Sequence, residues 1–210
     1  HGAIVSGGGA RATRAQLEAV LPRFIGDIAQ IPPMYSALKR DGQKLCDLAR
    51  QGIDVKVEPR PTQVYAIDVL HENEDGSFIL QIRCGRGTYI RTLCNDIGEA
   101  LGTKAHMGVL LRTQTGMFTL DEAHTIEEID AAEDLTPLLV AMDKPLGHLP
   151  RLDVQPKAER FVRNGNKLTR RELIGDIQPG KPTRLYLNGQ FCGIGRFEGE
   201  NLKFDAMLLE

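Results

Sequence analysis

One short stretch of the sequence, from Cys84 to Arg91, carries side chains in an order that suits a chemical site. Its pattern predicts a strand, a glycine-flanked turn and a helix with Thr88 as its N-cap. Arg91 falls in the first helical turn, where the helix dipole disfavours a cation, so a carboxylate or phosphate meeting the guanidinium would explain its place. An exposed arginine whose stem covers apolar surface is the simpler alternative, and the spacing leaves both open.

Signatures of metal-dependent and nucleotide-hydrolysing enzymes are absent from the sequence. It contains no Gly-x-x-x-x-Gly-Lys-Ser/Thr, no Gly-x-Gly-x-x-Gly that opens a helix, no Gly-x-Ser-x-Gly and no His-Glu-x-x-His. Five histidines lie without ligand spacing, and four cysteines form no Cys-x-x-Cys pair. We therefore expect no metal, no cofactor, and free thiols in a reducing, cytoplasmic compartment.

The composition limits the kinds of partner. The 210 residues are 41% hydrophobic and 26% charged, which suffices to bury a core without disulfides or metals. No apolar run approaches the roughly 20 residues of a membrane helix, so no membrane is expected. The formal net charge is −2, but residues 151–184 hold nine basic and four acidic residues. Contact with an anionic polymer and a solvated face are equal alternatives for this basic stretch.

Hydrophobic periodicity predicts the elements that would position the Cys84–Arg91 stretch. A Thr13-x-x-Gln16 capping box opens a helix over residues 13–21. Strands over 64–69 and 78–84 are expected to pair antiparallel across turn-forming residues. The helix that follows Thr88 carries an apolar stripe, and a strand over about 107–113 should then return to the sheet.

The second half of the chain shows a change of pattern. A Thr125-x-x-Glu128 capping box predicts helices that run to about residue 141, and residues 143–150 have the prolines and glycine typical of a domain boundary. Asn188-Gly189 between two apolar runs predicts a type I′ hairpin. We predict an α+β fold with antiparallel strand pairs and flanking helices over 1–148, followed by a small β-rich module over 149–210.

Three stretches give the chain a resemblance to the bacterial tRNA pseudouridine-55 synthase (TruB) family. They are Ile31–Lys39 with Leu45–Ile53, then Gly87–Gly102, and then Ala105–Thr113. The match runs in order and spacing from about residue 13 to residue 149. The tail resembles that family's C-terminal PUA-like RNA-binding module. The resemblance implies that residues 1–148 form the later part of a pseudouridine synthase catalytic domain, with a mixed, mostly antiparallel sheet and flanking helices. It also implies that residues 149–210 form a small PUA-like β-barrel.

The resemblance also implies an activity: isomerisation of one uridine in the T arm of tRNA to pseudouridine. The N1–C1′ bond breaks, the base rotates, and C5 rejoins C1′, without cofactor or metal. The target base must be flipped out of a folded stem-loop, which costs a few kcal/mol of unstacking. The implied partner is the T stem-loop of tRNA, and a monomer is expected.

Site residues are carried over only onto matching positions. Arg91 matches the arginine that pairs with the family's catalytic aspartate, and an opposite charge nearby keeps such a carboxylate ionised. Tyr89 matches an aromatic residue of the uridine pocket, and Leu110 a leucine packed on the flipped base. Without the family, Tyr89 would be an amphipathic residue at a helix start, and Leu110 a core residue of a strand.

An insertion over about residues 31–60 matches the part of the family that grips the T arm. Its mildly basic character suits phosphate contacts and shape-directed recognition of RNA. We assign RNA binding to four residues of this insertion: Lys39, Arg40, Lys44 and Arg50. Cys46 stands where the family usually has tyrosine, which predicts a packing change. A solvated linker is the weaker alternative, because the segment contains several apolar residues.

Two family motifs are missing from the sequence. The catalytic aspartate belongs to a Gly-x-Leu-Asp-Pro motif, and an active-site tyrosine comes from the same earlier region, but neither motif occurs in these 210 residues. We therefore expect this chain, which begins at His1, to be the later part of a longer polypeptide and to be inactive alone. A catalytically silent RNA-binding or tRNA-remodelling protein is the main alternative, and a scaffold without RNA affinity is another.

Overall fold

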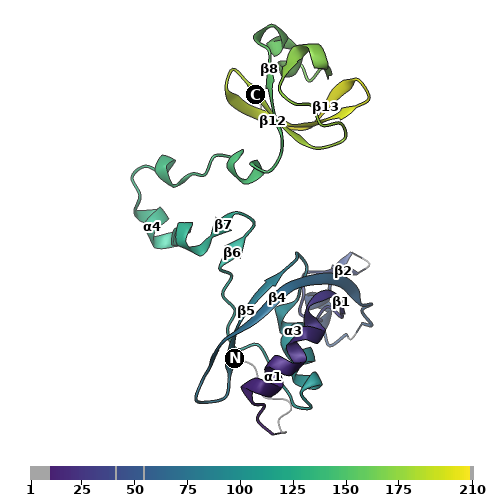
Figure 1. Cartoon of the computed structure of the whole chain (residues 1–210), viewed down its shortest axis with the longest axis vertical. Helices are drawn as coiled ribbons and strands as arrows, with labels where there is room; N and C mark the ends of the chain where they lie inside the picture. Colours follow the sequence, from purple (N-terminus) through teal and green to yellow (C-terminus); the bar gives the residue numbers. More distant parts are fainter. Residues whose placement is uncertain (1–9, 41, 54, 209–210) are drawn as a thin grey trace. The chain divides into compact units, whose positions relative to one another are not determined.

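Two units make up the chain in the computed structural model, which describes residues 10–40, 42–53 and 55–208 (Figure 1). Unit 1 comprises residues 1–110 and unit 2 comprises residues 111–210. The division follows the density of contacts within each unit. The β-rich sheet of unit 2 begins later, at Arg151, so the domain boundary expected after residue 148 stays a prediction.

A three-stranded antiparallel sheet organises unit 1. Its strand order is β1 (Gly26–Gln30), β4 (Arg60–Glu72), β5 (Phe78–Cys84). The β4–β5 hairpin is the predicted antiparallel pair, and two register shifts interrupt it. Because β1 pairs with the first half of β4, Gln30 at the end of β1 is held opposite Arg60 in a fixed register.

Two helices cover one face of this sheet. α1 (Arg14–Val20) starts with the predicted capping box, in which the Thr13 and Gln16 side chains each accept from the other residue's backbone amide. It continues into a 3-10 turn, η1 (Leu21–Phe24), at Pro22. α3 (Ile90–Ala100) packs beside α1. The shared core consists of Leu17, Leu21, Val64, Ile67, Leu93 and Ile97.

The insertion between β1 and β4 forms a small structure of its own. A hairpin of β2 (Lys39–Arg40) and β3 (Gln43–Lys44) leads directly into α2 (Leu45–Arg50). The Leu45 amide donates to the Leu38 carbonyl at 2.8 Å, which ties the start of α2 to the segment before the hairpin. Leu45 and Leu48 are buried. The described residues of the insertion therefore include a hairpin and a helix, as its apolar residues favoured.

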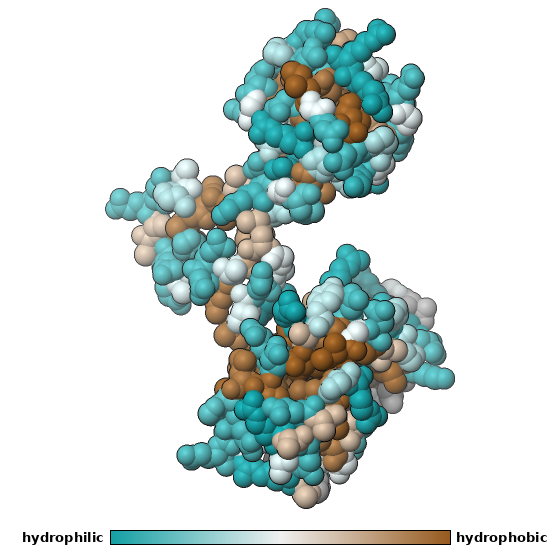
Figure 2. Space-filling view, viewed as in Figure 1, coloured by the Kyte–Doolittle hydropathy of each residue, from teal (hydrophilic) through white to brown (hydrophobic). Residues whose placement is uncertain are grey.

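The strand predicted over 107–113 is wrong. These residues lie outside any helix or strand, and the next two strands, β6 (Gln114–Thr115) and β7 (Phe118–Thr119), pair only with each other. Val109 is 90% exposed, and Figure 2 shows brown, apolar atoms at the surface of the stretch that follows. The sheet of unit 1 ends at β1 on one side and at β5 on the other, and the segment 107–113 pairs with neither of these edges.

The helices expected up to residue 141 are shorter than predicted. The Thr125–Glu128 capping box is present and opens α4 (Ile126–Ala131). A short 3-10 turn, η2 (Leu120–Glu122), precedes α4. Two more 3-10 turns, η3 (Thr136–Leu138) and η4 (Lys144–Leu146), follow it. α4 ends where the backbone of its C-cap residue, Ala132, becomes extended, and Pro137 lies in the separate turn η3.

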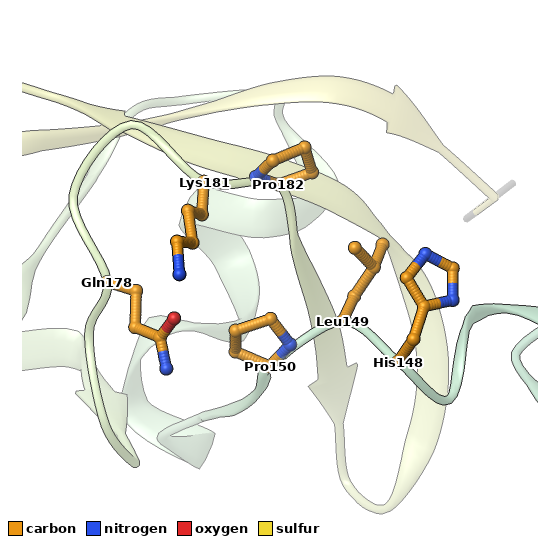
Figure 3. A pocket seen from close by; sticks show the side chains of 6 residues that line it. All are labelled: His148, Leu149, Pro150, Gln178, Lys181 and Pro182. Atoms are coloured by element: carbon orange, nitrogen blue, oxygen red, sulfur yellow. The ribbon is translucent and has the colours of Figure 1, made fainter. Parts of the chain in front are cut away.

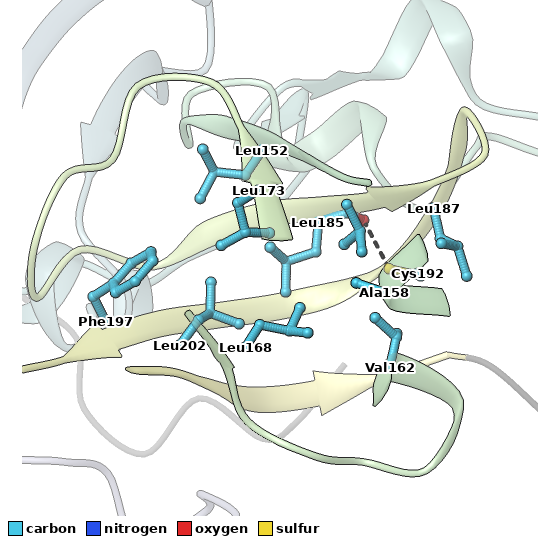
Figure 4. Packing of buried hydrophobic residues seen from close by; sticks show 11 residues of the cluster. Leu152, Ala158, Val162, Leu168, Leu173, Leu185, Leu187, Cys192, Phe197 and Leu202 are labelled. Atoms are coloured by element: carbon cyan, nitrogen blue, oxygen red, sulfur yellow. Dashed lines mark hydrogen bonds between the residues drawn. The ribbon is translucent and has the colours of Figure 1, made fainter. Parts of the chain in front are cut away.

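A six-stranded sheet closes around the core of unit 2 (Figure 4). In spatial order its strands are β10 (Leu173–Ile174), β8 (Arg151–Val154), β11 (Thr183–Leu187), β12 (Gln190–Glu198), β13 (Asn201–Met207) and β9 (Leu168–Thr169). Only β8 and β11 run parallel. The short helix α5 (Glu159–Arg163), between the 3-10 turns η5 (Pro156–Ala158) and η6 (Arg170–Glu172), completes the unit.

The turn between β11 and β12 has the predicted type I′ geometry. Asn188 and Gly189 both have positive φ, 51° and 78°. Nearby, the buried Cys192 thiol donates to the Leu185 carbonyl at 3.3 Å, and burial raises the pKa of this thiol to about 11. The α+β fold, with its mixed, mostly antiparallel strands and small C-terminal barrel, is confirmed. No helix among the described residues has the length and apolarity to cross a membrane.

Candidate functional site

The turn between β5 and α3 has the predicted order of strand, glycine turn and helix. The predicted N-cap is wrong, however: the helix begins at Ile90, and Tyr89 occupies the N-cap position without a side-chain cap of its own. The Thr88 hydroxyl donates instead to the Gly85 carbonyl at 2.9 Å. Its oxygen lies 2.6 Å from the Thr62 hydroxyl, which must then be the donor of that bond. Thr88 cannot cap the helix because it already closes the turn.

A residue that sequence reasoning missed takes over the role of the cap. Gln30, at the end of β1, is only 2% exposed. Its Oε1 accepts from the Tyr89 amide at 2.9 Å, and its Nε2 donates to the Tyr89 carbonyl at 3.3 Å. The two residues are 59 positions apart, so no local pattern could have paired them. The sequence shows only a glutamine immediately before Ile31-Pro32-Pro33, the start of the predicted insertion.

Tyr89 and Arg91 lie on the same turn at the entrance to α3. Tyr89 is half-buried, whereas Arg91 is exposed. No carboxylate stands in the first turn of α3, and no described side chain forms an ion pair or hydrogen bond with the Arg91 guanidinium. A cation against the positive end of a helix dipole can still receive an anion. The turn can therefore offer a guanidinium and a phenol to the same ligand.

Leu110 does not belong to the strand in which it was expected. It lies in the irregular segment at the end of unit 1, and its side chain is 56% exposed. The alternative of a buried core residue is therefore wrong for Leu110. Its place in a uridine pocket stays a prediction.

The basic residues of the insertion fall on three short elements. Lys39 and Lys44 are direct cross-strand partners in the β2–β3 hairpin, and both are exposed. Like charges that face each other in a hairpin are destabilising unless an anion lies between them. Arg40 donates to the Lys56 carbonyl, and Arg50 pairs with Asp47 at 3.2 Å. That exposed pair contributes little stability and leaves the guanidinium available to an anion.

Ionisable groups elsewhere in unit 1 do not form a second centre. Asp96 on α3 is partly buried, and burial raises its pKa, with the nearby Glu99 adding to the effect. The described residues contain no cluster of three His, Cys, Asp or Glu side chains that could hold a metal ion.

A cavity of about 350 Å³ lies in unit 2 (Figure 3). Gln178 and Lys181 reach it from the loop between β10 and β11, and His148, Leu149 and Pro150 from the segment before β8. Its lining combines one lysine with apolar and amide groups and no carboxylate, so it tolerates an anion better than a cation. None of these residues was predicted as a site residue.

The segment before β8 is fastened to the sheet by a polar network. The Tyr186 hydroxyl donates to the Asp143 carboxylate, and the Arg184 guanidinium donates to the Leu149 carbonyl at 3.1 Å. The Arg151 guanidinium stacks 3.8 Å above the centre of the Tyr186 ring. The bond from Tyr186 holds the pKa of Asp143 below its usual range, with Arg184 and Arg151 adding to the effect.

Two family models match consecutive parts of the chain. Residues 1–90 match the model described as TruB family pseudouridylate synthase (N terminal domain). Residues 91–146 match the model described as tRNA pseudouridylate synthase B C-terminal domain. The border between the two matches falls at the entrance to α3, between Ile90 and Arg91.

Curated relatives are similar over most of the chain. A protein of Alkaliphilus oremlandii (strain OhILAs) named tRNA pseudouridine synthase B is 43% identical over 195 residues, which cover 91% of this chain and 64% of the relative. A protein of Clostridium perfringens (strain 13 / Type A) with the same name is 36% identical over 200 residues, which cover 94% of this chain and 68% of the relative. The chain thus spans about two thirds of the length of these relatives.

Solved structures share the fold at lower identity. The chain aligns with a structure titled "Crystal Structure of a Cbf5-Nop10-Gar1 Complex" at a TM-score of 0.67 and 24% identity, over 94% of this chain and 63% of that one. It also aligns with a structure titled "Structure of H/ACA RNP bound to a substrate RNA containing 2'-deoxyuridine" at a TM-score of 0.69 and 20% identity. This alignment covers 96% of this chain and 63% of that one. At these identities the likeness concerns the fold alone.

Proposed function

Because the chain belongs to the TruB family of pseudouridylate synthases, we propose that it serves the isomerisation of a flipped-out uridine in the T arm of tRNA to pseudouridine. Relatives of which it spans about two thirds carry the name tRNA pseudouridine synthase B. The reaction moves the bond at C1′ from N1 to C5, so N1 gains a proton and C5 loses one. It needs neither oxidant nor cofactor.

The observation that carries the proposal is the free guanidinium of Arg91 at the entrance to α3. A carboxylate placed against it would stay ionised, because an opposite charge within ~4–6 Å lowers the pKa of an acid. An ionised aspartate is the form that can act as nucleophile or base toward the ribose or the base. Tyr89, on the same turn, would pack on the uracil, and Leu110 would add an apolar contact on it.

RNA binding is assigned to two parts of the chain. In the insertion, Lys39 and Lys44 face each other, and Arg40 and Arg50 lie on the adjoining elements. Their charge suits the phosphates of the T stem-loop, which fix register without reading sequence. Residues 149–210 would act as the second, PUA-like RNA-binding domain. A cytoplasmic monomer fits this work, since tRNA is the only partner it requires.

The 210-residue chain alone should not catalyse the reaction, because it contains no Gly-x-Leu-Asp-Pro motif. We define the completed protein as this chain joined to the part of the Alkaliphilus oremlandii relative that lies outside the matched region. Tritium at C5 of the target uridine leaves when C5 bonds to C1′, so its release measures turnover. We expect release from the completed protein and none from the 210 residues alone; release by the chain alone would refute the missing-motif argument.

Arg91→Ala in the completed protein tests the site. A partner of the catalytic carboxylate acts mainly in the chemical step, so kcat should fall at least about 100-fold. The dissociation constant for a T-arm stem-loop, measured by fluorescence anisotropy, should change less than threefold. Equal losses in turnover and binding would contradict the assigned role and make Arg91 a phosphate contact.

The absent aspartate motif favours one rival: a catalytically silent protein that binds or remodels tRNA. Such a protein would bind and unfold the T arm, and its natural polypeptide would contain no Gly-x-Leu-Asp-Pro motif and release no tritium. A scaffold without RNA affinity would show no salt-dependent binding, whereas phosphate contacts weaken steeply as salt rises.

A further inference from the structure

The side-chain amide of Gln30 forms a closed pair of hydrogen bonds with a single backbone unit at the entrance to α3. Its oxygen accepts from the Tyr89 amide and its nitrogen donates to the Tyr89 carbonyl, at 2.9 and 3.3 Å. The partners identify the orientation of the side chain, because the backbone offers one donor and one acceptor. Each end of the glutamine is thus engaged by the backbone of Tyr89, with one N–H donating and the oxygen accepting.

Because Gln30 is buried, the loss of either hydrogen bond would be costly in free energy. Gln30 is only 2% exposed, and a buried amide group without a hydrogen-bond partner destabilises the folded state by its full desolvation free energy. The Tyr89 carbonyl also accepts from the Leu93 amide at 3.0 Å, the first hydrogen bond of α3. Gln30 therefore fixes the residue on which the helix starts, and with it the direction in which the helix leaves the sheet.

Two further bonds join the same pieces of chain. The Thr92 hydroxyl donates to the Ile31 carbonyl at 3.4 Å. Thr92 directly follows Arg91, and Ile31 directly follows Gln30. On the other side of Tyr89, the Thr62 and Thr88 hydroxyls link β4 to the turn. The end of β1 is itself held in antiparallel register on β4. The entrance to α3 is thus attached to a rigid strand on both sides of Tyr89.

We infer that Gln30 is a positioning residue that holds the Tyr89 side chain and the Arg91 guanidinium in their working places. The inference rests on the proposed function for the roles of Tyr89 and Arg91, but the hydrogen bonds stand without it. Gln30 is buried and does not reach the exposed side of the turn, so it acts through Tyr89 alone. A displacement of about 1 Å at a reacting group can cost about 100-fold in rate.

The chemistry of the bonds predicts how each substitution behaves. Gln30→Ala removes both side-chain hydrogen bonds to the Tyr89 backbone, which leaves the Tyr89 amide without its acceptor and the carbonyl with the Leu93 amide alone. Gln30→Glu keeps the shape, but an ionised carboxylate has no proton to give to the Tyr89 carbonyl. Its protonated form donates through the hydroxyl and accepts through the carbonyl, as the amide does. Burial raises the pKa of such a carboxyl group, so the native bonds should return as the pH falls.

The test compares these variants with Leu17→Ala, which weakens the core of unit 1 without touching the turn. In the completed protein, Gln30→Ala should lower kcat 10- to 100-fold and change the dissociation constant of a T-arm stem-loop less than threefold. Leu17→Ala should leave kcat within twofold at temperatures where it is folded. Gln30→Glu should gain activity relative to the parent protein as the pH is lowered.

Three results would overturn the inference. The first is an equal loss of kcat in Gln30→Ala and Leu17→Ala. The second is a loss of RNA binding as large as the loss of turnover, and the third is a flat ratio of Gln30→Glu to parent activity across the pH range. If Gln30→Ala does not fold, the pH dependence of Gln30→Glu activity relative to the parent decides whether Gln30 positions the turn.

Hydrogen exchange in the 210-residue chain separates this inference from the proposed function. The Tyr89 amide should exchange at least tenfold faster in Gln30→Ala than in the parent chain, while amides in the middle of α3 change less than threefold. If the parent completed protein releases no tritium, the proposed function fails, yet this measurement still tests the positioning. Unchanged exchange at Tyr89 would overturn it.

Discussion

Arg91 raises the free energy of the folded 210-residue chain, because a cation in the first turn of a helix opposes the helix dipole. α3 carries no acidic residue in that turn to offset it. Replacing Arg91 by glutamine should therefore stabilise this chain by about 0.3–1 kcal/mol at low ionic strength. Urea unfolding in 10 mM and 500 mM salt would measure the gain, which should shrink as salt screens the dipole.

The same substitution should abolish turnover in the completed protein. A residue that costs stability and yet supports catalysis is typical of a functional site. Arg83→Gln, an exposed change on the neighbouring strand β5, serves as the control and should give no gain. A loss of stability in Arg91→Gln would mean that its stem packs on apolar surface, which is the simpler alternative from the sequence.

Tyr186 should make the stability of unit 2 depend on pH through Asp143. Its hydroxyl bond holds the pKa of Asp143 below the usual range, so the carboxylate form stabilises the fold. The folded pKa is the lower one, so this contribution is present above the unfolded pKa and is lost as the pH falls through the folded pKa. Tyr186→Phe should lower Tm at pH 7, and the difference should vanish in acid.

NMR titration of Asp143 provides the direct check on this bond. Its pKa should rise toward the ordinary value in Tyr186→Phe. Because the two residues act as one pair, Asp143→Asn combined with Tyr186→Phe should cost less than the sum of the single changes. Additive losses would show that the hydroxyl and the carboxylate contribute independently.

At the scale of elements, α3 depends on a glycine in its last turn. A Cβ at Gly98 would lie 2.6 Å from the Ala105 backbone nitrogen, because the returning chain presses against the helix there. Helix propensity alone would favour alanine by about 0.8–1.0 kcal/mol. Overpacking costs typically 1–3 kcal/mol, so Gly98→Ala should destabilise the chain despite its better propensity.

Asn95→Ala is the matched control, since Asn95 is exposed on the same helix. It should gain a few tenths of a kcal/mol from propensity without meeting another segment. Thermal unfolding of the two variants separates packing from propensity. A Gly98→Ala variant as stable as the parent would show that the chain near Ala105 moves away at little cost.

Elements were predictable from the sequence where their determinants are local. The capping boxes at Thr13 and Thr125 involve side chains three residues apart, and the Asn188-Gly189 turn depends on two adjacent residues. The cap of α3 was mispredicted because its partner, Gln30, lies 59 residues away. The strand over 107–113 failed for a related reason: a local run of apolar residues does not say whether the segment will pair with a sheet edge.

At the scale of the whole molecule, the fold class followed from the change of pattern along the chain. Strands that alternate with helices in the first half, and a chain made mostly of strands after Arg151, correspond to the two kinds of sheet that form. The candidate site could be predicted from the sequence less completely than the fold class. Tyr89 and Arg91 are neighbours in sequence and therefore stay neighbours in space, whereas Leu110 depends on how a segment without regular structure is placed.

RNA binding by both units should be visible in its salt dependence. Each phosphate contact releases counterions and contributes about 0.7–0.9 to the slope of log affinity against log salt. Lys39 and Lys44 in unit 1, and Arg160 and Arg171 in unit 2, are exposed and form no ion pair with another described residue. If tRNA contacts both units, either pair of glutamine substitutions should lower the slope by about 1.4–1.8.

The four substitutions together should lower the slope by the sum of the two effects, because contacts on separate units release their counterions independently. Arg163→Gln is the control, since its guanidinium pairs with Glu159 at 2.8 Å, a closer and less exposed ion pair than that of Arg50 with Asp47, and should contribute less to the slope. Filter binding of a T-arm stem-loop and of a whole tRNA at several salt concentrations gives both slopes. An unchanged slope for the unit 2 pair on whole tRNA would confine RNA binding to the insertion, and residues 149–210 would then need another role.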